Sequence, residues 1–129
     1  MPAQEIGYRG ELLNLLIRQG ATLGPFAVTL TNPNATQLNL TGSTLRAQVR
    51  KKALDATPVV ALTCTITNAA AGQFTFGLTA VQTAGLPAGE LISDADSKYV
   101  WDMELEDVAG TVFPLYFGDV QIFREVTRP

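Results

Sequence analysis

The sequence contains no histidine and a single cysteine, and each scarcity excludes a class of chemistry. Without histidine, the chain lacks the commonest general base, the commonest metal ligand and any histidine-based catalytic triad. One cysteine, Cys64, cannot form an intramolecular disulfide, which suits a reducing compartment such as the cytosol. The sequence also has no phosphate-binding loop and no zinc-ligand spacing. An enzyme would have to work through carboxylates alone, and no pair stands out, so we expect a non-enzymatic protein with no cofactor.

The chain has little net charge and no long apolar run. A net charge of −3 argues against nucleic-acid binding through general electrostatics. The N-terminus lacks the charged start and apolar core of a signal peptide. The apolar run at residues 12–17 is far too short to span a bilayer, and Asn14 interrupts it. We therefore expect neither nucleic acid nor a membrane as a partner.

What is present indicates one globular domain. The 129 residues are 47% hydrophobic and 16% charged, which is enough for one core without disulfides or metals. Residues 1–10 are polar and punctuated by glycine, so we expect them to form an N-terminal arm. Residues 11–129 then form the folded domain.

The domain is built of short alternating segments. In residues 98–106, Tyr99, Trp101, Met103 and Leu105 point one way, and Asp102, Glu104 and Glu106 point the other, which predicts a strand with one buried face. Similar patterns predict strands at 11–18, 23–31, 43–51, 59–67, 73–78 and 111–124. Thr79 and Gln82 form a capping-box pattern, which predicts one helical turn between the fifth and sixth strands.

Seven short strands with regularly spaced turns predict an all-β fold, an immunoglobulin-like antiparallel β-sandwich. No Cys…Trp…Cys pattern is present, so an antibody-type domain is not expected. The residues expected to be buried are Val28, Leu45, Val49, Leu62, Ile66, Phe76, Trp101, Met103 and Leu105.

The first and last predicted strands carry more apolar side chains than one inner face can use. The last contains the run VFPLYF at 112–117, in which Pro114 predicts an edge strand or a bulge. We expect this surplus to contact partner proteins. The alternative is that the arm covers it within the same molecule. The predicted partner-binding residues are Ile6, Tyr8, Leu12, Leu16, Phe113, Leu115 and Phe117.

Two further groups carry charge. Asp94 and Asp96 could ligate calcium, but the pattern lacks the ligand count of a calcium loop, and a solvated acidic loop is favoured. Arg46 and Arg50 could bind an anion. We favour instead a pairing with Asp102, Glu104 and Glu106, because the third and sixth strands of such a sandwich are neighbours.

Four stretches together resemble small virion proteins of tailed bacteriophages, including the N-terminal sandwich domain of baseplate upper-fibre proteins. They are LTGSTLRAQVRKK at 40–52, NAAAGQFTF at 68–76, LTAVQTAGLP at 78–87 and YVWDMEL at 99–105. The resemblance covers about residues 23–126. It implies an immunoglobulin-like module that docks one tail component onto another.

On this resemblance we expect a structural protein of a virion, made in the host cytoplasm. Its partners would be other virion proteins, including copies of itself. No fibre domain follows Pro129, which favours an adaptor, baseplate or decoration role over receptor binding. Two alternatives stay open: a capsid decoration or neck protein, and a carbohydrate-binding sandwich with calcium at Asp94 and Asp96.

Overall fold

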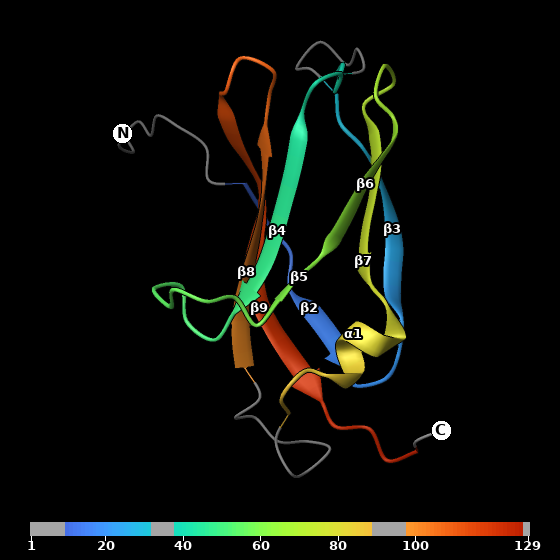
Figure 1. Ribbon diagram of the computed structural model, residues 1–129, viewed down its shortest axis with the longest axis vertical. Coiled ribbons are helices and arrows are strands. Elements are labelled where there is room, and N and C mark those ends of the chain that lie inside the picture. The colour runs from blue at the N-terminus through green and yellow to red at the C-terminus, as the bar shows by residue number, and fades with distance from the viewer. Residues whose placement is uncertain (1–9, 32–37, 89–97, 128–129) are drawn as a thin grey trace, which may run out of the picture.

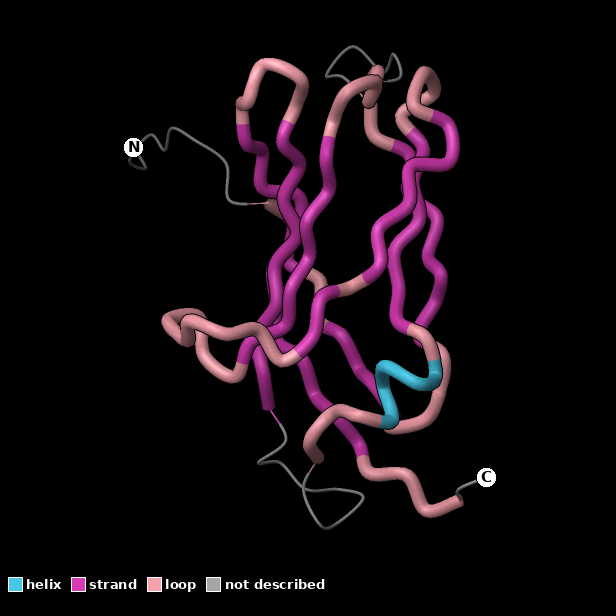
Figure 2. The backbone as a smooth tube through the Cα atoms, in the orientation of Figure 1, coloured by secondary structure: helices cyan, strands magenta, loops and turns pink. Residues whose placement is uncertain are grey.

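The computed structural model describes residues 10–31, 38–88 and 98–127, which form two packed β-sheets and one short helix (Figures 1 and 2). The large sheet contains β1 (Glu11–Leu12), β2 (Leu15–Arg18), β4 (Thr44–Arg50), β5 (Val60–Ala61), β8 (Lys98–Glu106) and β9 (Val112–Phe123). Its order is β1-β9-β8-β4-β5, and β2 also pairs with β9. The small sheet has the order β3-β7-β6, from β3 (Leu23–Thr29), β6 (Thr63–Asn68) and β7 (Gln73–Leu78).

This arrangement confirms the predicted all-β, immunoglobulin-like sandwich. The second and fifth predicted strands and most of the fourth lie in one sheet, and the third, sixth and seventh lie in the other, as in immunoglobulin domains. The helical turn is also confirmed: α1 spans Ala80–Ala84 between β7 and β8. The Gln82 amide donates to Thr79 Oγ1 at 3.2 Å, and the Thr79 amide donates to Gln82 Oε1 at 2.9 Å.

The core lies between the sheets and follows the predicted alternation. Tyr99, Trp101, Met103 and Leu105 of β8 are all buried. The rings of Phe76 and Trp101 stack with centroids 6.0 Å apart across the two layers. Of the predicted core, six residues are buried, namely Val49, Leu62, Phe76, Trp101, Met103 and Leu105. The other three, Val28, Leu45 and Ile66, are partly buried and pack against them.

The predicted strand over residues 59–67 is in fact two strands in different sheets. β5 pairs with β4 in the large sheet, and β6 pairs with β7 in the small one. Leu62 lies at the corner, where its amide still donates to the Ala47 carbonyl at 2.9 Å. Figure 1 shows the chain crossing between the layers at this point. An alternating pattern cannot reveal such a crossing, because Leu62 is buried at the corner just as it would be within one continuous strand.

The first predicted strand also differs from expectation. It divides into β1 and β2, and both pair with β9 in parallel rather than antiparallel orientation. The Asn14 side chain causes the interruption, because its Oδ1 atom accepts a hydrogen bond from the Asp119 amide at 2.9 Å. Strict alternation would place Leu13 on the same face as Leu15 and Ile17, but Leu13 is 37% exposed whereas the other two are buried.

The last predicted strand was expected to be an edge strand or to contain a bulge. It is not an edge strand, because β8 lies on one side of it and β1 and β2 lie on the other. The bulge that Pro114 predicted is present. Met103 pairs with Tyr116 and Glu104 pairs with Pro114, so Leu115 is an extra residue in β9. The bulge shifts which side chains of β9 face the core, so Phe113 and Leu115 lie on a different surface from Phe117.

Candidate functional site

The bulge in β9 separates the predicted partner-binding residues into two groups on different surfaces. Leu12 and Leu16 lie on the outer face of the large sheet and are 65% and 63% exposed. Phe117 lies beside Leu12, its partner in the strand register. Phe113 and Leu115 instead line a groove between the two sheets. Ile6 and Tyr8 lie outside the described residues.

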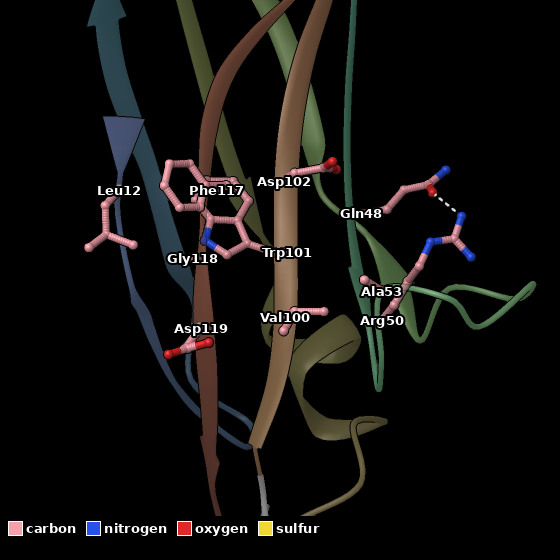
Figure 3. Close-up of a pocket in the computed structure, with 10 residues that line it drawn as sticks. All are labelled: Leu12, Gln48, Arg50, Ala53, Val100, Trp101, Asp102, Phe117, Gly118 and Asp119. Atoms are coloured by element: carbon pink, nitrogen blue, oxygen red, sulfur yellow. Dashed lines mark hydrogen bonds between the residues drawn. The ribbon is translucent and has the colours of Figure 1, made fainter. Parts of the chain in front are cut away.

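The outer face of the large sheet carries a shallow concavity of about 480 Å³, which we call the outer hollow. Leu12 and Phe117 lie on one side of it, Val100 and Asp102 in the middle, and Ala53 on the far side (Figure 3). Its complete lining is Leu12, Gln48, Arg50, Ala53, Val100, Trp101, Asp102, Phe117, Gly118 and Asp119. The outer hollow thus combines apolar side chains with two carboxylates and one guanidinium.

Asp102 is the carboxylate in the middle of the outer hollow. Although the residue as a whole is exposed, partial desolvation of its carboxylate raises the pKa of Asp102, and the nearby Glu104 carboxylate raises that pKa further. The positive charge of Arg50 opposes both effects and lowers it. Among the described residues, neither Asp102 nor Asp119 forms an ion pair. Two carboxylates therefore face the outer hollow without an ion-pair partner among the described residues.

A tight turn, Lys52 to Asp55, forms one rim of the outer hollow. The Asp55 amide donates to the Lys52 carbonyl at 3.0 Å, and the Asp55 side chain accepts from the Lys52 amide at 3.2 Å. Arg50 fixes the base of the turn by donating to the Asp55 carbonyl at 2.7 Å and to Gln48 Oε1 at 2.6 Å. Leu54, at the tip, is 99% exposed. We call residues 52–55 the rim turn.

A second concavity, of about 830 Å³, opens between the two sheets beside β3 and the first half of β9. We call it the intersheet groove. Its apolar lining includes Val28, Leu30, Leu38, Leu105, Val108, Phe113 and Leu115. Phe113 and Val108 are 45% and 79% exposed, so apolar surface faces solvent here as well. The outer hollow and the intersheet groove share no lining residue.

The predicted pairing between the third and sixth strands is confirmed for Arg46. Its guanidinium lies 3.0 Å from Glu104 and 3.5 Å from Glu106, across the antiparallel pair β4–β8. The hydrogen bond to Glu104 is the main cause that raises the pKa of Arg46. Arg50 makes no such ion pair with any described residue, because its register partner on β8 is Val100 rather than a carboxylate.

The remaining candidate residues are two aspartates, a cysteine and a tryptophan. Asp94 and Asp96 lie outside the described residues, and the described part of the chain contains no group of three or more metal-ligating side chains. Cys64 is half-buried, and burial raises the pKa of its thiol, which disfavours the reactive thiolate. Trp101 is 3% exposed and packs in the core, so its ring is not a stacking platform for a ligand.

Periodicity could not reveal the rim turn, because it belongs to no strand. The available signal was an apolar residue, Leu54, next to the acidic Asp55 and shortly after Lys51 and Lys52. An isolated leucine in a polar loop is common on protein surfaces, and so the signal was weak.

No protein-family model and no curated protein matches this chain. In the described ranges, no helix is long and apolar enough to cross a membrane. The fold therefore defines the class, a small all-β sandwich, and the function rests on the two surfaces described above.

Proposed function

We propose that this chain is a non-enzymatic structural protein of a tailed-phage virion that docks tail or baseplate components to one another. The observation that carries the proposal is the presence of two apolar concavities, the outer hollow and the intersheet groove, with no lining residue in common. A protein that connects two components needs two surfaces that can be occupied at once. The resemblance of residues 23–126 to phage sandwich domains supplies the biological setting.

The energetics favour a docking role for both surfaces. Leu12, Leu16 and Phe113 expose between 45% and 65% of their area. Fully burying such a side chain stabilises a complex by about 1.5–3 kcal/mol before the costs of association. A few well-buried side chains carry most of the binding energy at a specific interface. The sandwich itself gains nothing from leaving them in water.

The proposal is tested on purified phage particles from a host that expresses this chain with a detectable tag. Mass spectrometry of the particles should identify the chain as a component. Leu12→Asp and Phe113→Asp should each give a folded protein that is depleted from particles, because Leu12 lines the outer hollow and Phe113 lines the intersheet groove. Deleting residues 1–10 should likewise leave a folded, soluble sandwich that fails to incorporate.

Val81→Asp is the matched control, since Val81 is 84% exposed on α1 and lines neither concavity. This variant should incorporate at the level of the unmodified chain. Absence of the chain from particles would overturn the proposal. Incorporation of both surface variants at the level of the control would also overturn it.

Two further measurements separate the alternatives. Labelling the tag in electron micrographs distinguishes a tail or baseplate location from a capsid or neck location. A glycan panel, screened with and without a chelator, tests the carbohydrate-binding alternative. Specific glycan binding that disappears with the chelator would replace the docking proposal.

A further inference from the structure

The rim turn presents Leu54 in a conformation that the fold holds in place. Hydrogen bonds from Lys52 and Arg50 to Asp55 fix the turn, and Leu54 at its tip is 99% exposed. Figure 1 shows the loop between β4 and β5 projecting beyond the outer face of the large sheet. Because the turn is already ordered, inserting Leu54 into a partner would cost little conformational entropy.

The charges around Leu54 complement those of the outer hollow. Lys52 in the rim turn and Lys51 just before it are exposed, and neither forms an ion pair within the described ranges. Asp102 and Asp119 face the outer hollow and are also unpaired there. The projecting element thus carries two lysines beside one aspartate, Asp55, and the outer hollow carries two aspartates beside one arginine, Arg50. Their net charges are opposite.

The rim turn and the outer hollow lie on the same face, since Ala53 belongs to both. A protein cannot insert its own rim into the hollow that the rim borders. Two copies related by a twofold axis can each insert the rim turn into the other's hollow. Such an interface is closed and self-complementary, because each copy contributes the same two surfaces.

We propose that the outer hollow binds the rim turn of a second copy of this chain, giving a twofold dimer in which Leu54 is the apolar contact and lysine–aspartate pairs surround it. The inference rests on the proposed docking function, because it names the partner of one of the two surfaces. The intersheet groove is left for a different virion protein.

Sedimentation velocity over a range of protein concentrations provides the test. The unmodified chain should show a monomer–dimer equilibrium. Leu54→Asp should weaken dimerisation by about 100-fold, because burying a leucine contributes roughly tenfold or more in affinity and the contact occurs twice in each dimer. Val81→Asp, on a distant exposed residue, should leave the dissociation constant unchanged.

A charge exchange gives the sharper result. Lys51→Glu combined with Lys52→Glu reverses the rim, and Asp102→Lys combined with Asp119→Lys reverses the hollow. Each double variant alone should be monomeric, whereas an equimolar mixture should dimerise, because both contacts of the mixed dimer pair opposite charges. Circular dichroism of each variant checks its fold.

An unmodified chain that stays monomeric at its solubility limit would overturn the dimer. A dimer that tolerates Leu54→Asp as well as Val81→Asp would overturn it too, as would a mixture that stays monomeric. None of these outcomes touches the virion proposal, which is decided by the presence of the chain in particles.

Discussion

The indole Nε1 of Trp101 donates a hydrogen bond to the backbone carbonyl of Leu13 at 2.7 Å, joining residues 88 positions apart. The bond reaches from the centre of the core to the point where β1 and β2 are interrupted. Gly118 pairs with Trp101 in the strand register, and a Cβ atom there would lie 2.3 Å from the same Leu13 carbonyl oxygen. The N-terminal strand therefore lies against β9 at a point where Trp101 supplies a hydrogen-bond donor and Gly118 has no side chain to block the approach.

Trp101→Phe should lower the free energy of unfolding by about 1–3 kcal/mol, because the Leu13 carbonyl loses its donor. Trp101→Ala should cost more, about 3–5 kcal/mol, because it also leaves a cavity. Trp101 is the chain's single tryptophan, so urea unfolding should be followed by circular dichroism rather than fluorescence. A phenylalanine variant as stable as the unmodified chain would show that the bond contributes nothing.

Gly118→Ala should destabilise the protein by about 1–3 kcal/mol, the usual cost of forcing extra atoms into a filled space. The added Cβ would displace Leu13 and Asn14. Gly85→Ala is the matched control, since the nearest atom to a Cβ at Gly85 lies 3.7 Å away. Thermal unfolding should separate the two variants clearly. Equal stability of both would contradict the close approach of the first strand to β9.

Asp102→Asn should raise stability at neutral pH. The folded-state pKa of Asp102 lies above its ordinary value of 3.8, so the folded protein favours the protonated form. The stability contributed by this group is present in acid and is lost as the pH rises through the raised pKa. The advantage of the variant should therefore shrink as the pH falls toward 3.8. Urea unfolding at several pH values provides the measurement. If the variant is less stable at neutral pH, the attraction of Arg50 outweighs burial.

Glu104→Gln should cost at most about 1 kcal/mol, and the loss should shrink in high salt. The Arg46–Glu104 pair is short at 3.0 Å, but both side chains are about 40% exposed to solvent. A double-mutant cycle with Arg46→Met isolates the interaction between the two residues. A coupling energy well above 1 kcal/mol that is insensitive to salt would mean that the pair is far better shielded than its exposure indicates.

The sequence predicted the sandwich, the central strand pair and the helix start because each depends on neighbouring residues. The alternation of residues 98–106 required a half-buried strand, and Thr79 with Gln82 formed a local hydrogen-bonded cap. The sheet crossing at Leu62 and the parallel pairing of β1 and β2 depend on contacts far along the chain. Alternation gives no information on either.

The same limit explains the candidate site. Leu12, Leu16, Phe113, Leu115 and Phe117 could be recognised as an apolar surplus, but their division between two surfaces depends on the bulge at Leu115. Pro114 indicated a bulge or an edge without choosing between them. The rim turn became recognisable only because folding places Ala53 across the outer hollow from Phe117.

The parallel pairing of β1 and β2 with β9 determines how the domain bears tension. The described chain enters this pair at Glu11 and leaves it after Phe123, at the opposite end. A pull on those two points slides the strands lengthwise past each other, so their hydrogen bonds are strained together rather than broken one after another. An antiparallel pair would place the two points side by side and would peel open from one end. Under such a pull, the sandwich would be loaded in shear along the axis of its own terminal strands.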